Sequence, residues 1–390
     1  MPTYLDHAAT TPIRPEVLAT YLEALKGVGN PSSVHKFGQD ARNALEAARE
    51  SLARIVGANR SEVIFTSGGT ESDNLAVKGL YWQRKGEDAN RSVVITAGTE
   101  HHGVLDPIYW LADHQGAEVV MVPVDSRGVF DLYWLGNYLA VNGARVALIS
   151  LMWVNNETGV IADIHAVTTL AAEFGIPVHT DAVAAFGHTP IDFASSGLAA
   201  MSISAHKIGG PVGSGALIVG RAVKLTSLVH GGGQERGMRS GTMDAAGAQA
   251  FSLAAELALA ELASEEKRLA VLSERLVSGV HDIAPDAMLS RGDATGLAAT
   301  VHLTFPGCSA DSMIFLLDAA GVSVSAGSAC TAGVNRPSHV LLAMGRTEDE
   351  ATGALRITLG YTTTAADIDK FLEAFPSVHA SAKKAGLPSK

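Results

Sequence analysis

Cysteine is scarce in this sequence, because only Cys308 and Cys330 occur among its 390 residues. Two cysteines cannot build a disulfide framework or a zinc site made of cysteine alone. Such usage is typical of a protein whose thiols stay reduced, so we expect a cytoplasmic location. The sequence predicts no metal site.

Long apolar runs and an excess of basic residues are also missing. No stretch approaches the roughly 18 apolar residues that span a bilayer. The start, MPTYLDHAATTP, has neither the basic nor the apolar part of a signal peptide, so we expect neither membrane association nor export. A formal net charge of −11 argues against direct nucleic-acid binding. The motifs GxxxxGK(S/T) and, after a strand, GxGxxG are absent, so a Walker loop or a dinucleotide site is not indicated.

The sequence does contain short apolar runs that alternate with amphipathic stretches. The runs predicted to be strands lie at 61–67, 92–98, 117–125, 144–154, 176–182 and, around a glycine-rich loop, 201–220. The stretches predicted to be helices lie at 68–82, 101–116 and 165–175. This alternation favours an α/β fold in which a mainly parallel sheet carries helices on both faces.

The length of the chain predicts two domains, because it exceeds the size that one core usually serves. A long Ala/Leu/Glu-rich stretch at 245–283 predicts a helix with a possible break, and the pattern after it predicts a smaller α+β unit. We place a large domain at 16–258 and a small C-terminal domain at 259–390. We expect the segment 1–15 to pack with the small domain.

Polar residues follow several of the apolar runs. Ligands bind open α/β sheets outside the carboxyl ends of the strands, so we expect these residues at one edge. Gly68–Thr70 would open a helix and offer an anion site, and His101, Asp181 and Lys207 follow later runs. Each alone is more often structural, since such an aspartate commonly caps a helix and such a lysine is commonly solvated. Together, a phosphate site, a carboxylate and a lysine match the needs of pyridoxal phosphate.

Cys330 has an unusual setting for a cysteine. The stretch 325–341, SAGSACTAGVNRPSHVL, places it among Ser, Gly and Ala with no large apolar residue in the four positions before it. A cysteine kept for packing usually lies in an apolar segment. We therefore expect a functional role for Cys330. Cys308, in LTFPGCSAD, lacks these surroundings and is expected to be structural.

A series of motifs runs nearly end to end through the chain. In order they are YLDHAATTP, GNPSS, FTSGGTESDN, TEHH, VNNETG, SAHKIGGPVGSGAL, HGGGQERGMRSGT, GSACTAG and LRITLG. With these motifs the sequence resembles the cysteine desulfurases of the NifS/IscS type, which are pyridoxal-phosphate enzymes of the class V aminotransferase family with fold type I. The resemblance implies a pyridoxal 5′-phosphate cofactor and the conversion of L-cysteine to L-alanine, with the sulfur left as a persulfide on Cys330.

The resemblance implies a role for each residue around the cofactor ring. Lys207 would carry the Schiff base, and Asp181 would pair with the ring nitrogen. His101 would stack on the ring and move protons. Asn156 would contact the 3′-oxygen of the cofactor and the substrate. Arg356 would bind the substrate carboxylate, a group that a planar guanidinium pairs well.

The resemblance implies that residues from two subunits bind the cofactor phosphate. Those of one subunit are Gly69, Thr70, Ser204 and His206. Thr242, in the RSGT turn, would reach the phosphate bound by the partner subunit. A homodimer is therefore implied.

The resemblance also implies that Cys330 travels, because its sulfur is collected beside the cofactor and handed to another protein. Gly327 and Gly333 would let the loop order and disorder at low cost. At roughly 3.3 Å per residue, the segment 326–337 could carry the thiol over about 10 Å. The spacing from Cys330 to PSHVL matches the long-loop group of the family. Iron–sulfur scaffolds and tRNA-thiolation proteins are therefore implied as sulfur acceptors.

Two positions depart from the family pattern. Ala184 stands where the family usually has a glutamine that donates to the 3′-oxygen, and Ala205 stands where a glycine is common. Neither change removes a group that makes or breaks a bond. Both bear on how the Schiff base is tuned.

Two other functions stay open at this point. A selenocysteine lyase or another aminotransferase-like enzyme would explain Lys207 and Asp181 but would leave Cys330 without a purpose. A non-catalytic scaffold for sulfur-transfer partners is disfavoured, because it would not need Lys207, Asp181 and His101 together.

Overall fold

A seven-stranded sheet forms the centre of the computed structural model, which describes residues 2–327 and 337–385. The strand order is β2-β8-β7-β6-β5-β3-β4. The bounds are β2 (Val63–Thr66), β3 (Val93–Ala97), β4 (Glu118–Val122), β5 (Val146–Ser150), β6 (Val178–Asp181), β7 (Ala200–Ser204) and β8 (Gly215–Val219). β8 runs antiparallel to both neighbours, and the other pairs are parallel. The carboxyl ends of all strands but β8 therefore lie at one edge.

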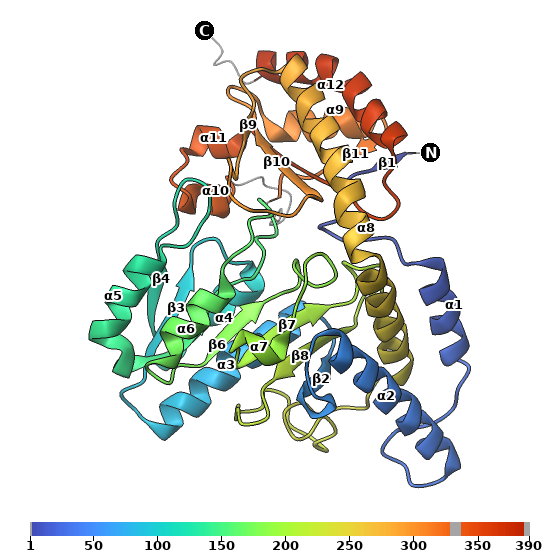
Figure 1. Cartoon of the computed structure of the whole chain (residues 1–390), viewed down its shortest axis with the longest axis vertical. Helices are drawn as coiled ribbons and strands as arrows, with labels where there is room; N and C mark the ends of the chain where they lie inside the picture. The colour runs from blue at the N-terminus through green and yellow to red at the C-terminus, as the bar shows by residue number, and fades with distance from the viewer. Residues whose placement is uncertain (1, 328–336, 386–390) are drawn as a thin grey trace.

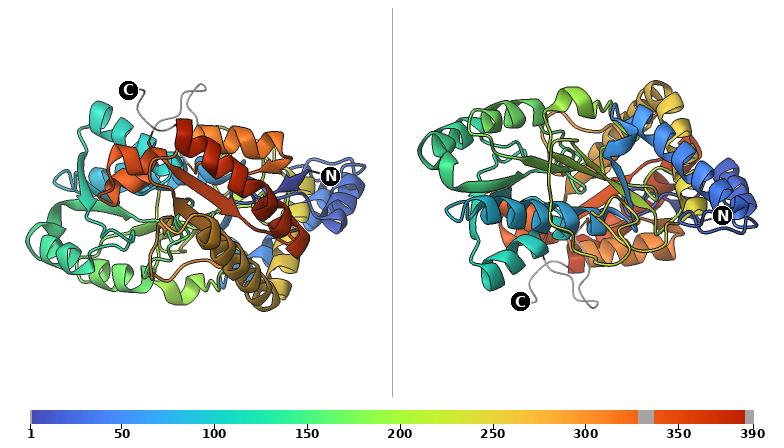
Figure 2. Two further views of the ribbon diagram at one scale, coloured as in Figure 1. Left: turned by 90° about the horizontal axis from the view of Figure 1, so that it is seen from above. Right: turned by 90° about the horizontal axis from the view of Figure 1, so that it is seen from below.

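Helices cover both faces of this sheet, because side chains alternate between the faces along each strand. Val63 and Ile64, neighbours on β2, belong to apolar clusters on opposite faces. The helices on the face of Ile64 are α3 (Gly69–Glu87) and α4 (His102–Gln115). Those on the other face include α2 (Lys36–Ile55), α5 (Leu132–Asn142), α6 (Ile164–Ala172) and the first part of α8 (Ala245–Ile283) (Figure 1, Figure 2). The predicted α/β fold with a mainly parallel sheet is confirmed.

A separate apolar cluster forms around a three-stranded antiparallel sheet of order β12-β10-β9. Its strands and helices are β9 (Met288–Leu289), β10 (Thr300–Thr304), β12 (Ala354–Thr358), α9 (Ala310–Ala319) and α12 (Ala365–Ala385). Leu5 joins this cluster, and β1 (Thr3–Tyr4) pairs in parallel with β11 (Val322–Ser323). In Figure 1 these elements gather above the central sheet.

One continuous helix of 39 residues, α8 (Ala245–Ile283), connects the two clusters. The break that the sequence suggested is not there. The first part of α8 packs on the central sheet through residues such as Phe251, and the second part packs on the small sheet through residues such as Leu276. Its glycines, Gly247 and Gly279, lie near its ends, and strong helix formers fill the middle.

The remaining helices are short and join these layers. They are α1 (Pro15–Ala24), α7 (Phe193–Ser196), α10 (His339–Ala343), α11 (Glu348–Thr352) and 3-10 turns at Arg60–Glu62 and Gly143–Arg145. Among the helices of residues 2–327 and 337–385, none has both the length and the apolar character that crossing a membrane requires.

Candidate active site

A cavity of about 410 Å³ opens at the carboxyl edge of the central sheet. Ligand pockets commonly have volumes of about 300–1,000 Å³. The segments that follow β2, β3, β5, β6 and β7 contribute to its wall, and β12 of the small sheet completes it. The predicted site residues that line it are Gly69, Thr70, His101, Asn156, Asp181, His206, Lys207 and Arg356. The fold thus brings together residues that are far apart in the chain.

Lys207 lies in the loop between β7 and β8 and reaches the cavity. Burial lowers the pKa of its amine to about 8, an effect that the nearby carboxylate of Asp181 opposes. The Thr11 hydroxyl donates to the Lys207 backbone carbonyl at 3.0 Å and ties this loop to the N-terminal segment. Because its pKa lies near neutrality, Lys207 offers an unprotonated, nucleophilic amine more often than a surface lysine does.

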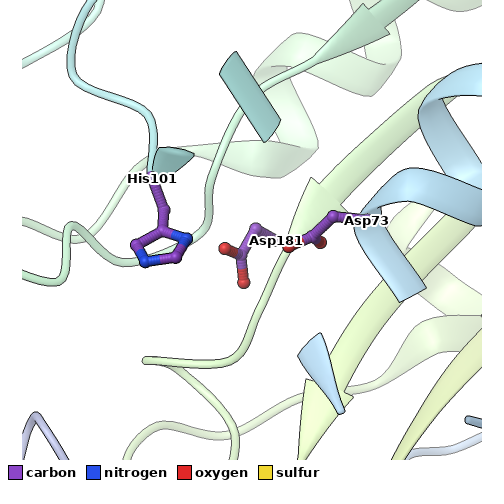
Figure 3. A group of neighbouring side chains, drawn as sticks. All are labelled: Asp73, His101 and Asp181. Carbon is purple, nitrogen blue, oxygen red and sulfur yellow. The ribbon is translucent and has the colours of Figure 1, made fainter. Parts of the chain in front are cut away.

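Asp181 is the last residue of β6, and His101, directly before α4, lies beside it (Figure 3). The Gly103 N–H donates to His101 Nδ1 at 2.9 Å, so the neutral ring carries its proton on Nε2. Burial lowers the pKa of His101, and Asp181 opposes that change. The Val183 N–H donates to Asp181 Oδ1 at 2.8 Å and fixes the carboxylate. The site therefore holds an oriented carboxylate next to an imidazole that is able to move a proton.

Asp73 is a third member of this group, and sequence reasoning did not single it out. Polar atoms of Asp73, His101 and Asp181 all lie within 4.8 Å of one another. Such donors could also ligate a metal ion, but here they share a cavity with Lys207, and the combination suits pyridoxal phosphate. The signal for Asp73 was its helical spacing from Gly69, since residues at i and i+4 share a helix face.

The start of α3 forms the predicted anion site. The helix begins at Gly69, directly after Gly68 with its positive φ of 149°. A Cβ on Gly69 would lie 2.7 Å from Val183 Cγ2, so a side chain here would collide with that of Val183. Free N–H groups and the positive dipole end of a long helix favour a phosphate at this point.

The other residues predicted at the phosphate are more widely spread. His206 lines the cavity, and burial, with the charge of Lys207, lowers its pKa to about 4. Ser204 ends β7, is buried behind the cavity wall, and has its Oγ 3.5 Å from the Ser214 carbonyl oxygen. Thr242 lines a different pocket of its own chain, together with Ser214.

Arg356 and Asn156 leave polar atoms open in the wall of the cavity. Arg356 donates from Nη1 to the Asn156 carbonyl oxygen and from Nη2 to Asp6 Oδ1, each at 2.9 Å. Arg356 Nε and Asn156 Oδ1 are buried and have no hydrogen-bond partner among the described residues. Buried polar atoms are normally paired, so an open donor and an open acceptor indicate that a ligand completes this wall. The residues present therefore fit a bound cofactor and an amino-acid substrate.

Cys330 and Gly333 lie outside the described residues. Gly327 and His339, described residues on either side of that segment, both line the cavity. Cys308 is 5% exposed, and burial raises its pKa, as expected for a structural thiol.

Glu157 adds a buried acid to the wall of the cavity beside His339. Burial raises its pKa, and the Ser338 hydroxyl donates to its carboxyl group. The His339 ring lies 4.9 Å from that of His102, measured between ring centres. No pattern in the sequence distinguished Glu157 from other acids, because only the fold places it here.

Ala184 lines both the main cavity and a small adjoining one of about 30 Å³. Lys207 and Asn156 border both spaces as well. The position where the family usually has a glutamine therefore has free volume next to it.

Comparisons with known proteins agree with this geometry. Residues 3–371 match the family model described as aminotransferase class-V. An IscS-like cysteine desulfurase of Mycobacterium tuberculosis is 48% identical, over 98% of each chain. The cysteine desulfurase IscS of Methanosarcina thermophila is 40% identical, over 96% of this chain and 91% of that one.

Solved structures give the same result. A NifS-like protein superimposes with a TM-score of 0.90 at 33% identity, covering 98% of this chain and all of the other. A NifS-like protein from Rickettsia africae has a TM-score of 0.86 at 31% identity, covering 97% of this chain and 100% of that one. The chain belongs to the aminotransferase class-V family and, within it, to the cysteine desulfurases. Proteins of this family depend on pyridoxal phosphate.

Proposed function

We propose that this protein removes sulfur from L-cysteine, releases L-alanine and holds the sulfur as a persulfide on Cys330. The thiol of Cys330 takes up the sulfur atom, and the substrate carbon that loses it gains a proton, so atoms balance. The observation that carries the proposal is the shared cavity, whose wall contains Lys207 with its lowered pKa together with Asp181 and Arg356. Selenocysteine lyase activity would use the same groups without needing Cys330.

The residues of the cavity divide the work between holding and proton transfer. When bound, pyridoxal phosphate supplies the electron sink for chemistry at the substrate Cα. The α3 N-terminus would hold its phosphate, Asp181 would accept the proton of its ring nitrogen, and Lys207 would hold it covalently. Lys207 Nζ is placed to take up and return a proton, because burial lowers its pKa. His101 faces the same cavity with its Nε2–H, which is a proton donor.

Arg356 would fix the substrate by its carboxylate. The open Nε–H and the hydrogens of Nη1 and Nη2 that are not used within the chain are the donors available for this contact. A carboxylate held at the β12 side of the cavity would direct the Cα toward Lys207. This contact positions the substrate and takes no part in bond breaking.

We infer that the active form is a homodimer in the cytoplasm that passes sulfur to acceptor proteins, with iron–sulfur scaffolds and tRNA-thiolation proteins as the expected kinds. The position of Thr242 supports the dimer, because this residue does not line the cavity of its own chain. Exposed apolar side chains also support an interface, among them Val34, which is 84% exposed, and Phe37, which is 63% exposed.

The test is to supply L-cysteine to the protein loaded with pyridoxal phosphate and to measure alanine and protein-bound persulfide together. Equal amounts of both are expected in the first turnover. Formation of a keto acid without persulfide would indicate an aminotransferase. Turnover of selenocysteine but not of cysteine would indicate a selenocysteine lyase. A protein that neither binds the cofactor nor turns over either substrate would indicate a scaffold.

A further inference from the structure

Asp73 is a buried acid that the chemistry above does not use. It lies on α3 and is 1% exposed, although it borders the same cavity as Lys207. Its Oδ1 has no hydrogen-bond partner among the described residues. An ideal Cβ built on Gly103 would lie 2.9 Å from its Oδ2, so the start of α4 encloses the carboxyl group on that side.

Within residues 2–327 and 337–385, no lysine or arginine forms an ion pair with Asp73. His179 Nε2 is 3.7 Å from Asp73 Oδ1, too far for a hydrogen bond. The two ring nitrogens of His179 are already bonded to the hydroxyls of Ser150 and Ser202, each at 2.9 Å. Burial lowers the pKa of His179 to about 3, so this ring is neutral.

A second carboxylate lies close by, and it is better supported. Polar atoms of Asp73 and Asp181 lie within 4.8 Å of each other (Figure 3). Asp181 receives the Val183 N–H and is the more exposed of the two, at 6% against 1%. Two buried carboxylates at this distance repel each other, so the less exposed one keeps its proton.

Burial and the neighbouring acids act on Asp73 in the same direction. Burial raises the pKa of Asp73 well above its ordinary value, and Asp181 and Glu100 raise it further, while Ser202 and Lys207 oppose them. The titratable groups that face it from the neighbouring elements are Asp181 and His179 on β6, Glu100 and His101 before α4, and Lys207 after β7.

We propose that Asp73 is a positioning residue that stays protonated at neutral pH, so that Asp73 and Asp181 together place a single negative charge in the part of the cavity wall where Asp181 would hold the ring nitrogen of the cofactor. This inference rests on the proposed function. A single charge matches the single proton of the ring nitrogen. An ionised Asp73 would also raise the pKa of Lys207 and favour its charged, non-nucleophilic form.

Infrared spectroscopy of the full-length protein tests this directly, with and without cofactor, in wild type and in Asp73→Asn. Asparagine has the shape of a neutral aspartic acid but lacks its C=O band. The wild type minus variant spectrum at neutral pH should contain the band of a protonated carboxyl group. The matched control is Asp113→Asn on the exposed face of α4, whose difference spectrum should show only an ionised carboxylate. A carboxylate band in the Asp73→Asn difference would overturn the proposal.

Stability against pH provides a second readout on the cofactor-free protein. A carboxyl group whose pKa is raised on folding contributes stability below its unfolded pKa, and this stability is lost as the pH rises through the folded pKa. The Asp73→Asn variant has no group to titrate at this position and does not lose this stability. As the pH rises, its melting temperature should therefore increase relative to that of the wild type. Parallel curves, or a growing deficit of the variant, would contradict the inference.

The variant Asp181→Asn provides a further infrared test, which can be carried out even if Asp73→Asn does not fold. Removing the neighbouring charge should let Asp73 release its proton at lower pH, and the protonated-carboxyl band should titrate accordingly. An unmoved titration would show that the two acids are not coupled. None of these readouts requires turnover, so failure of the desulfurase assay and failure of this inference are distinguishable.

Discussion

Replacement of Arg356 tests whether the substrate carboxylate is bound where the structure leaves donors open. Arg356 is 5% exposed and donates hydrogen bonds to the Asn156 carbonyl oxygen and to Asp6 Oδ1. Its Nε–H remains unpaired among the described residues. We consider Arg356→Lys, which keeps the charge but loses the planar fork, and Arg356→Gln, which loses both.

The size of the effect follows from the number of hydrogen bonds lost. A hydrogen bond to a charged group contributes about 1.5–3 kcal/mol. Loss of one such bond in Arg356→Lys should raise the KM for L-cysteine about 10- to 150-fold, because each 1.4 kcal/mol is tenfold. Arg356→Gln should raise it further. The kcat at saturating cysteine should fall less than KM rises, since this contact positions the substrate.

The assay is steady-state alanine formation, together with cofactor content and melting temperature for each variant. Cofactor content and melting temperature are needed because Arg356 also donates to Asp6 at 2.9 Å. Replacing Arg356 therefore also destabilises the N-terminal segment. The matched control is Arg291→Lys, whose Nη1 donates to the Thr300 carbonyl at 2.6 Å and which does not line the cavity. A KM within twofold of wild type in both Arg356 variants would refute the assignment.

The remaining predictions concern the cofactor, the thiol and the dimer. Lys207→Ala should abolish activity and leave no borohydride-reducible bond to the cofactor, and retention of that bond would show that another amine holds it. Cys330→Ser should bind cysteine without forming persulfide, while Cys308→Ser should keep most activity; the reverse pattern would contradict the roles of the two thiols. Thr242→Ala should bind pyridoxal phosphate about 10- to 100-fold more weakly, and mixing it with Lys207→Ala should restore activity in hybrid dimers, which a contact within one chain would not allow. Ala184→Gln should lower the pH midpoint of the cofactor absorption change by about one unit, since a new donor stabilises the deprotonated state; an unchanged or raised midpoint would count against that contact.

Short patterns in the sequence were enough to predict the strands of the central sheet. Short apolar runs marked β2 to β8, because a strand that is buried on both faces is apolar along much of its length. The helix α8 was correctly located, but its continuity was not, since a long Ala- and Glu-rich helix also occurs in two pieces in other proteins. Its unbroken course follows from packing on two different sheets.

Lys207, Asp181 and His101 were found from the sequence because each follows an apolar run and lies within a recognisable motif. That they share one cavity is consistent with the rule that parallel strands end at the same edge. Their roles remain predictions that the variants above test. Asp73 was overlooked, although its spacing of four residues from Gly69 places both on one face of α3.

The sequence by itself determined the fold class, the family and the residues available for chemistry, because these depend on local periodicity and on motifs read along the chain. The tertiary structure decided which of those residues meet. Arg356 pairs with Asp6 across nearly the whole length of the chain, and Asp73 comes to lie beside Asp181 only through the order of strands in the sheet. Burial, which sets the pKa values of Lys207 and Asp73, likewise depends on every element packed around them and has no counterpart in a short stretch of sequence.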